Sequence, residues 1–454
     1  MTHAGKSTSI GHLLYSTKNI NLNGFQKLAK QAYEWGLYSF RYAWIMDIYK
    51  YERESGHTLL SYSREFETEK YYFSIIDIPG KKNLIKNTIK GIFQGDVGII
   101  VVPADKDGIK NIFSDEESFK DQIITAYTMG IKQVIVAINK MDLCNYSEKI
   151  YLEIKEKIRK FLVQIGFNDI RYVCYSGITG QNVVNRYEDD DISKINKVNM
   201  TPWYKGNTLL EELEQLKQPI RLINKPLRIS IFDSQKISGV GWILIGIIKT
   251  GILKRDMPIC LSLPFYYNKK NYLCIKCKCF SIEKYCKDLY MAFPGDIVGI
   301  KIKNLFSYLW YNNMKRISLI RNFEEDISLK VIDFTAIINV INVPNSIKVG
   351  YCPTMFCHTK HICVKFIKIL YKIDRRTNKI MEKNPIEIKN GERAVVLFEL
   401  NSKYESKKFF NFEKYSENPF FGNFILRDNN KIIAVGKIKE INRIKCDKKD
   451  ILEI

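Results

Sequence analysis

The chain has 454 residues and a formal charge of +22, from 71 lysines and arginines against 49 aspartates and glutamates. This length predicts about three domains at roughly 150 residues each, and 46% hydrophobic residues with only 25 glycines and 12 prolines exclude a disordered or fibrous protein. The sequence has the pattern of neither a secretory leader nor a membrane-spanning run, so we expect a cytoplasmic protein with reduced cysteines and no membrane segment.

The first half of the chain alternates short apolar runs with helical patterns. Strands are expected over residues 71–76, 97–102, 134–138 and 171–175, and a helix over 147–166, where apolar residues recur at three- and four-residue steps. Strands separated by helices are typical of a parallel α/β sheet, in which ligands bind at the carboxyl ends of the strands. The polar residues that directly follow these strands are therefore candidates for a binding site.

Two segments of this half carry residues suited to phosphates and a metal ion. Residues 5–8 read Gly-Lys-Ser-Thr, the second half of a phosphate-binding loop, at the start of a helical pattern. The N–H groups at such a helix start cradle phosphates, Lys6 pairs with the β- and γ-phosphate oxygens, and Ser7 offers its hydroxyl to Mg²⁺. An Asp-Ile-Pro-Gly segment follows an apolar strand, where Asp77 can hold Mg²⁺ through water and Gly80 can donate its N–H to the γ-phosphate. Taken separately, the first segment is a weak motif and the second is better explained as an ordinary turn.

A sharper signal is the Asn-Lys-Met-Asp segment at residues 139–142, directly after an apolar strand. The carboxylate of Asp142 can accept hydrogen bonds from both N1–H and N2–H₂ of guanine, whereas adenine has no matching pair of donors. The amide of Asn139 can serve the N7 and O6 side of the base, the stem of Lys140 can lie over the ring, and backbone N–H groups of residues 176–178 can reach O6. The order of these segments predicts a guanine-nucleotide site. The residues expected to contact GTP or GDP are Gly5, Lys6, Ser7, Thr8, Asp77, Gly80, Asn139, Lys140, Asp142, Ser176, Gly177 and Ile178, with Ser7 and Asp77 also expected at Mg²⁺.

From about residue 220 the chain reads as short β-strands punctuated by glycine, asparagine and proline. Strands are expected over 227–232, 242–248, 297–302, 331–343, 362–369 and 394–400. Without a long amphipathic helix, this pattern favours two antiparallel β-barrels joined near residue 330. Residues 206–454 carry 43 lysines and arginines against 25 aspartates and glutamates, whereas residues 1–205 carry 28 against 24. Either the second half faces a polyanion or A/T-rich codon usage has raised the lysine content; the asymmetry favours a polyanion.

The order of motifs resembles the translational GTPases of the eukaryotic elongation factor 1-alpha group over nearly all 454 residues. Residues 42–54 are similar to the first switch region of that group, and residues 203–206 and 225–228 are similar to the entry into its second domain. The resemblance implies an α/β P-loop GTPase domain followed by two antiparallel β-barrel domains, and a GTP-dependent carrier of a tRNA-shaped cargo to the ribosomal A site. It also implies that Thr58 binds Mg²⁺ in the GTP state. The expected domains are residues 1–220, 221–330 and 331–443, with a basic tail over 444–454.

The resemblance leaves the branch of the group open. Residues 357–359 and 374–376 of the third domain are similar to the elongation factor, whereas residues 11–15 and 176–182 of the GTPase domain are similar to the HBS-type ribosome-rescue GTPase. The elongation reading implies aminoacyl-tRNA as cargo, and the rescue or class II release-factor reading implies a tRNA-shaped protein. Both imply the ribosome as partner and leave the exchange factor undefined.

Several departures from the family pattern concern the chemistry. The first strand and the first glycine of the phosphate loop are missing before Gly5, so either the true start lies upstream or this copy has decayed. Lys81 stands where the group has the histidine that positions the attacking water. In one interpretation its ammonium group stabilises charge in the transition state. In the other it faces solvent, hydrolysis is weakened, and the chain is a nucleotide-gated binding protein. His57 replaces an apolar residue that screens this water, and compensation for the lost histidine is one interpretation. Residues 118–122 replace a helix of the group whose sequence bears on exchange-factor contacts.

Overall fold

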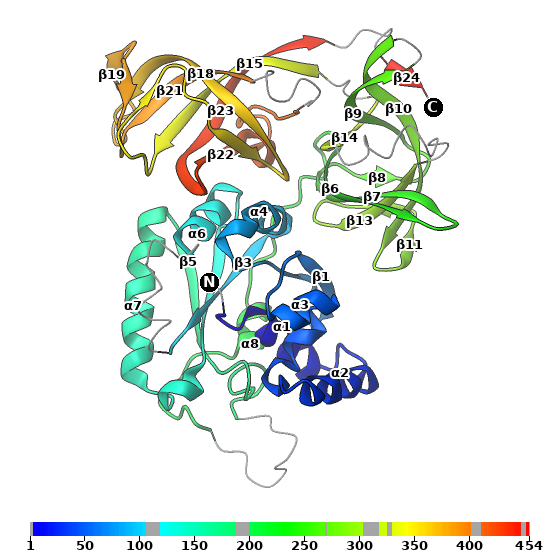
Figure 1. Ribbon diagram of the computed structural model, residues 1–454, viewed down its shortest axis with the longest axis vertical. Coiled ribbons are helices and arrows are strands. Elements are labelled where there is room, and N and C mark those ends of the chain that lie inside the picture. The colour runs from blue at the N-terminus through cyan, green and yellow to red at the C-terminus, as the bar shows by residue number, and fades with distance from the viewer. Residues whose placement is uncertain are drawn as a thin grey trace. The chain divides into compact units, whose positions relative to one another are not determined.

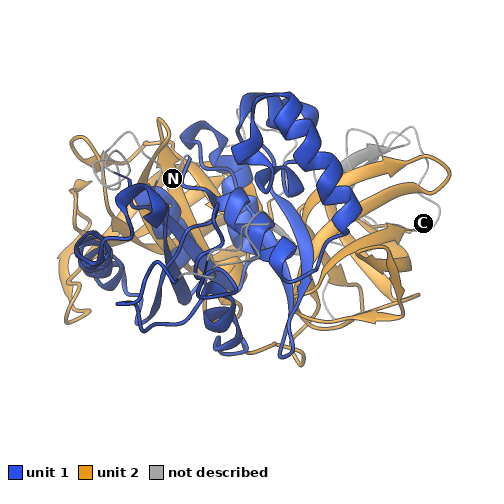
Figure 2. Cartoon of the chain, turned by 90° about the horizontal axis from the view of Figure 1, so that it is seen from below, with its two compact units in different colours: residues 1–219 blue, residues 220–454 orange. Residues whose placement is uncertain are grey.

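A computed structural model of the chain describes residues 3–105, 119–187, 199–267, 270–302, 317–324, 329–400, 410–445 and 451–453. The chain divides into two compact units, residues 1–219 and 220–454 (Figure 2). None of the helices in the described ranges is long and apolar enough to cross a membrane.

The first unit combines a parallel sheet, a separate hairpin and surrounding helices (Figure 1). Strands β3 (Val97–Pro103), β4 (Gln133–Asn139) and β5 (Asp169–Cys174) form the parallel sheet in the order β3-β4-β5, and β1 (Tyr62–Glu67) and β2 (Tyr72–Asp77) form the antiparallel hairpin. The α-helices are α1 (Lys6–Ser16), α2 (Leu22–Glu34), α3 (Lys50–Ser55), α4 (Ile85–Gln94), α6 (Phe119–Thr128), α7 (Glu148–Ile165) and α8 (Leu209–Glu214). Single 3₁₀ turns are η1 (Tyr38–Phe40), η2 (Ala43–Ile45), η3 (Lys82–Leu84) and η4 (Met141–Cys144).

The parallel sheet forms around β4, whose apolar residues 134–138 are almost fully buried. A strand covered on both faces is expected to be a continuous run of β-branched and aliphatic residues, as this one is. Helix α7 ends at Gly166, whose φ of 115° favours glycine, and a Cβ there would lie 2.6 Å from the hydroxyl of Tyr127. Burial of each aliphatic side chain of this helix stabilises the fold by about 1.5–3 kcal/mol. The buried residues of α7 are Tyr151, Ile154, Ile158 and Leu162.

Strand β2 departs from the parallel arrangement expected for residues 71–76. It runs antiparallel to β1, with Tyr62 opposite Asp77 and Glu67 opposite Tyr72. Within the described ranges, no strand pairs with the second edge of β2 or with the outer edge of β3. Such edges leave backbone N–H and C=O groups without ladder partners. The parallel sheet therefore begins at β3.

The second unit begins with a closed antiparallel barrel in the strand order β10-β13-β7-β6-β14-β9. Closure comes from β9, which pairs with both β14 and β10. Leu244, Ile259 and Ile275 are among the fully buried residues of its core. Its strands are β6 (Arg228–Ile237), β7 (Gly241–Thr250), β9 (Pro258–Tyr267), β10 (Lys270–Lys284), β13 (Ile297–Ile302) and β14 (Leu319–Asn322), with short strands β8 (Leu253–Lys254), β11 (Lys287–Leu289) and β12 (Met291–Ala292) beside them.

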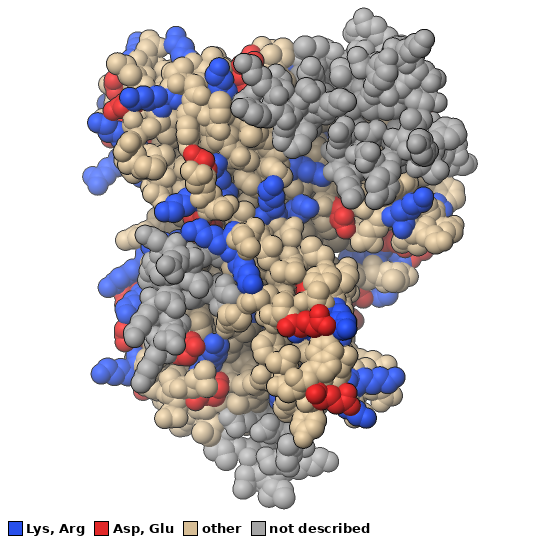
Figure 3. All heavy atoms as spheres, viewed as in Figure 1, with Lys and Arg blue, Asp and Glu red and all other residues tan. Residues whose placement is uncertain are grey.

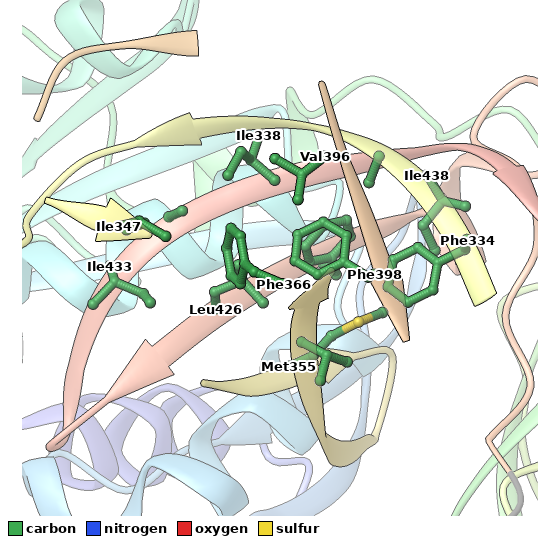
Figure 4. Close-up of a cluster of buried hydrophobic side chains, with 14 of the residues drawn as sticks. Phe334, Ile338, Ile347, Met355, Phe366, Val396, Phe398, Leu426, Ile433 and Ile438 are labelled. Carbon is green, nitrogen blue, oxygen red and sulfur yellow. The ribbon is translucent and has the colours of Figure 1, made fainter. Parts of the chain in front are cut away.

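A second closed antiparallel barrel follows in the order β17-β22-β23-β15-β21-β18, and β17 pairs with β18 to close it. Phe334, Phe366 and Phe398 lie together in its centre (Figure 4). The ring centroid of Phe398 is 5.1 Å from that of Phe334 and 4.6 Å from that of Phe366. The predicted pair of antiparallel β-barrels is confirmed. The elements are β15 (Leu329–Val340), β16 (Ile347–Lys348), β17 (Thr354–Cys357), β18 (Lys360–Ile373), β19 (Ile380–Lys383), β20 (Glu387–Ile388), β21 (Arg393–Leu400), α10 (Pro419–Gly422), β22 (Asn423–Asp428) and β23 (Lys431–Lys445).

A buried ion cluster connects the two barrels of this unit. Glu413 accepts a hydrogen bond from Arg228 of β6, and its carboxylate lies 3.7 Å from Arg321 of β14. All three side chains are at most 8% exposed. Burial opposes ionisation of Glu413, but the two guanidinium groups outweigh it and hold the pKa of the carboxyl below its usual value. The cluster therefore depends on its negative charge.

Part of the basic tail that we expected over residues 444–454 forms a strand. Strand β24 (Ile451–Glu453) pairs in parallel with residues 274–276 of β10, on the first barrel. Lys276 binds Glu453 at 2.9 Å, and Leu452 packs against the barrel core. Residues 446–450 of that expected tail lie outside the described part of the chain.

Candidate nucleotide-binding site

The first unit contains a cavity of about 380 Å³ where the carboxyl end of β4 meets the start of α1 and residues 39–58. It brings together most of the residues that the sequence singled out. Predicted residues on its wall are Gly5, Lys6, Ser7, Thr8, Thr58, Gly80, Lys81, Asn139, Lys140, Asp142 and Ile178. Asp77, Ser176 and Gly177 lie behind the wall and contact it through Ser7, Asp142 and Asn139 respectively.

One end of the cavity has the groups needed to recognise guanine. Asp142 follows β4 in the turn η4, and its Oδ1 accepts a 2.6 Å hydrogen bond from the hydroxyl of Ser176. This bond orients the carboxylate through one of its oxygens. Lys140, at a φ of 63°, directs its ammonium group to Asp105 at 3.2 Å. In these positions the Asp142 carboxylate can accept hydrogen bonds from the edge of a guanine base, and the aliphatic stem of Lys140 can lie against the ring.

Asn139, expected at the base, also has a structural role. Its Nδ2 donates to the carbonyl of Ala4 at 2.8 Å, and its Oδ1 accepts from the N–H of Gly177 at 2.8 Å. The amide therefore ties the phosphate loop to the Ser-Gly loop, and it keeps a second N–H and a second oxygen lone pair for a base. Gly5, at a φ of 85°, allows this close approach, because a Cβ there would lie 2.4 Å from Nδ2.

The other end of the cavity has the features of a phosphate site. Gly5 is the N-cap of the 11-residue helix α1, and Lys6 and Ser7 are the first residues of that helix. The N–H groups and the positive end of the helix dipole therefore face the cavity, which favours an anion. Gly80 and Lys81 line the same cavity.

Four side chains beside this end, those of Ser7, Asp47, Thr58 and Asp77, offer oxygen atoms that can bind a Mg²⁺ ion. Ser7 Oγ lies 2.5 Å from Asp77 Oδ2 and 3.0 Å from Thr58 Oγ1, which donates to Asp47 Oδ1 at 3.0 Å. Asp77 Oδ1 is buried with no hydrogen-bond partner among the described residues. Hydroxyl and carboxylate oxygens are the ligands that Mg²⁺ prefers, so this donor set suits the ion.

The charges around these donors indicate a place for a cation. Burial and the neighbouring charge of Asp77 raise the pKa of Asp47 to about 7. Burial likewise raises the pKa of Asp77, and the ammonium group of Lys6 opposes the rise. Two carboxylates taken out of water at close range resist ionisation unless a positive charge accompanies them.

Two imidazoles that the predicted site did not include also line this end of the cavity. The rings of His3 and His57 have centroids 4.7 Å apart and are tilted by 49°. Burial, followed by the charges of Lys81 and His3, lowers the pKa of His57. Asp47, Phe40 and Leu143 are further wall residues that we did not predict, and only Asp47, eleven positions before Thr58, lay in a segment already singled out.

Comparisons with known proteins agree with a GTP-binding first unit and with this fold. Residues 1–219 match the family model of the elongation factor Tu GTP binding domain, and residues 333–439 match that of the GTP-eEF1A C-terminal domain-like family. Elongation factor 1-alpha of Plasmodium falciparum is 37% identical over 442 residues, which are 97% of this chain and 93% of that protein. The protein of the same name from Entamoeba histolytica is 38% identical over 441 residues, 96% of this chain and 93% of its own length.

A solved structure has a similar fold. The GTPase-like domain of S. cerevisiae Ski7, bound to GDP and inorganic phosphate, superposes with a TM-score of 0.75 over 96% of this chain and 95% of that chain. The two sequences are 20% identical. This likeness concerns the fold alone.

Proposed function

Because this chain belongs to the elongation factor 1-alpha family of translational GTPases, we propose that it carries aminoacyl-tRNA to the ribosomal A site in its GTP-bound form. The observation that carries the proposal is an identity of 34–38% over 96–97% of the chain with proteins named elongation factor 1-alpha. The identity extends through both compact units, so the proposal concerns the GTPase unit and the barrels together.

The distribution of charge supports an RNA cargo. Residues 206–454 hold 43 of the 71 lysines and arginines and carry a net charge of +18. Figure 3 shows lysine and arginine side chains scattered over the visible face, with some aspartates and glutamates among them. An RNA backbone is bound chiefly through such residues, with an affinity that falls as salt rises. A protein cargo without a high negative charge gives no comparable reason for this excess.

The phosphate end of the cavity suggests how GTP controls the segment at residues 38–60. In the GTP form, Ser7 and Thr58 would bind Mg²⁺ directly and Asp77 would bind it through water. Bound Mg²⁺ supplies charge neutralisation for the β- and γ-phosphates. Thr58 belongs to a loop in which Glu52 Oε1 accepts hydrogen bonds from the N–H groups of Leu59 at 2.8 Å and Leu60 at 3.1 Å. The nucleotide state would therefore be transmitted to this loop and to α3 before it.

The proposal is tested by protection of the aminoacyl ester. The full chain, loaded with GTP or GDP, is incubated with aminoacyl-tRNA or deacylated tRNA, and ester hydrolysis and complex formation are measured. We expect protection and binding with GTP and aminoacyl-tRNA only, and we expect Asp142→Asn, which impairs GTP loading, to remove both. Equal binding of deacylated tRNA, or no binding at all, would refute the elongation role. GTP-dependent capture of a tRNA-shaped release or rescue protein in its place would move the chain to the other branch of the group.

A further inference from the structure

GTP hydrolysis needs a group that holds the attacking water in line with the γ-phosphorus, and this group must accept a hydrogen bond. Lys81 cannot do so, because a lysine ammonium has three donors and no acceptor. Thr58 and Asp47 are bonded to each other, and Asp77 is bonded to Ser7. These side chains belong to the expected Mg²⁺ position, where the unpartnered Oδ1 of Asp77 would face the ion rather than the attacking water.

The imidazole of His57 differs from these groups. Its ring lines the cavity together with Gly80 and Lys81, and it makes no hydrogen bond with any of the described residues. It is also half-buried rather than pointing into open solvent. A neutral imidazole offers one ring nitrogen as an acceptor. The side chain therefore combines the right position in the cavity with an uncommitted acceptor.

The backbone around His57 is held in place from both sides. The preceding residue, Gly56, ends α3 at a φ of 64°, and the N–H of His57 donates to the carbonyl of Glu52 at 3.2 Å. The Glu52 side chain, 2% exposed, binds the two N–H groups that follow Thr58. The ring is thus directly adjacent in sequence to Thr58, an expected Mg²⁺ ligand. When Thr58 binds the ion, we expect the His57 ring to lie close to the γ-phosphate.

We propose that His57 positions the attacking water for GTP hydrolysis by accepting a hydrogen bond from it; this inference rests on the proposed nucleotide site. The water oxygen forms a bond to the γ-phosphorus, and the bond from that phosphorus to the bridging oxygen breaks, with its electron pair remaining on GDP. The water proton ends on the released inorganic phosphate. His57 is unchanged at the end of the reaction, and the Lys81 ammonium lies beside the developing negative charge.

The test compares His57→Leu with His57→Gln in the full chain. Leucine has similar bulk but no acceptor, whereas a glutamine side chain retains one and can orient an attacking water. Single-turnover hydrolysis of labelled GTP and the affinity for a fluorescent GTP analogue are measured for each. We expect His57→Leu to slow hydrolysis by about 100-fold, the size of effect that misplacing a reacting group produces. His57→Gln should stay within about tenfold of the original rate because it restores the acceptor. Nucleotide affinity should change by less than about threefold in both, because ground-state binding does not use the water.

Hydrolysis by His57→Leu at the original rate would overturn the inference, as would equal slowing of both variants or no hydrolysis by the original chain. These outcomes are distinguishable from failure of the delivery proposal. A chain that hydrolyses GTP in the predicted His57-dependent way but ignores aminoacyl-tRNA would keep this inference and lose that proposal.

Discussion

Replacing Asp142 with asparagine tests the guanine site most specifically. The carboxylate is expected to accept hydrogen bonds from N1–H and N2–H₂ of guanine. Asparagine keeps one acceptor oxygen, so the 2.6 Å bond from Ser176 can persist and the loop should keep its shape. The amide NH₂ would instead face the donor N2–H₂ group of the base. The perturbation is therefore confined to the recognition of the base.

The expected magnitude follows from the bonds that are lost. A hydrogen bond to a charged group contributes about 1.5–3 kcal/mol, and an unmatched buried donor adds to the cost. Loss of one such bond together with a donor–donor contact predicts about 3 kcal/mol, or roughly a 100-fold weaker affinity for GTP. Xanthine carries an oxygen in place of the N2 amine, and the asparagine NH₂ can donate to it. The variant should therefore prefer XTP to GTP.

Competition against a fluorescent GDP analogue measures these affinities for GTP, ITP and XTP. ITP lacks the 2-amino group, so it should bind the original chain more weakly than GTP by about tenfold. Asp169→Asn is the matched control, because Asp169 lies outside the cavity and pairs with Lys217 at 3.6 Å. Unchanged GTP affinity in Asp142→Asn, or equal losses in both variants, would refute the assignment of Asp142 to the base.

Three further predictions concern the second unit. Glu413→Gln should lower the free energy of opening of β6 and β14 by about 3–5 kcal/mol, because it removes a negative charge that faces two buried guanidinium groups. Hydrogen exchange in these strands that matches the exposed control Glu417→Gln would contradict this. Burial lowers the pKa of His358 to about 3, so stability from the neutral ring is complete above about pH 6.5 and is lost as the pH falls toward 3. Between pH 7 and pH 5 this effect should lower the free energy of unfolding by about 2 kcal/mol. Urea unfolding of His358→Asn, in which asparagine suits the φ of 45°, should not show this loss. The same pH dependence in the variant and the original chain would contradict the assignment. Deletion of residues 446–454 should speed hydrogen exchange at residues 274–276, whose edge β24 covers, and unchanged exchange would show that the pairing adds nothing.

The sequence predicted the elements around the site because its signals there are local. An apolar run that ends in a polar turn marks the carboxyl end of a strand, and Asp77, Asn139 and Asp142 were found in that way. The barrel strands were likewise visible as short apolar runs between turn residues. The positions of the two barrels along the chain follow from that texture alone.

Other features depend on contacts that sequence spacing does not encode. Asn139 binds Ala4 and Gly177, which lie 135 positions before it and 38 after it, so its structural role could not be read from the motif. The ion cluster at Glu413 joins residues 185 positions apart. Strand β24 is only three residues long, too short to show a strand period, and was expected as part of a tail.

Strand β2 is an instructive difference in the fold. Residues 71–76 were expected in the parallel sheet because they are mostly apolar and precede a polar loop. The structure pairs them with β1, whose sequence Tyr-Ser-Arg-Glu-Phe-Glu is largely polar and gave no strand signal. Only Phe66 of β1 is fully buried, so most of this strand is held by its ladder with β2 rather than by a hydrophobic face.

Delivery of aminoacyl-tRNA is tested most directly by dipeptide formation on purified ribosomes that carry an initiator tRNA in the P site. The full chain is added with aminoacyl-tRNA and either GTP or GDP, and the dipeptide is quantified after a fixed time. We predict rapid dipeptide formation with GTP, none above background with GDP, and a strong reduction with Asp142→Asn at the same GTP concentration. Dipeptide formation no faster with the chain and GTP than without the chain would contradict the proposed function.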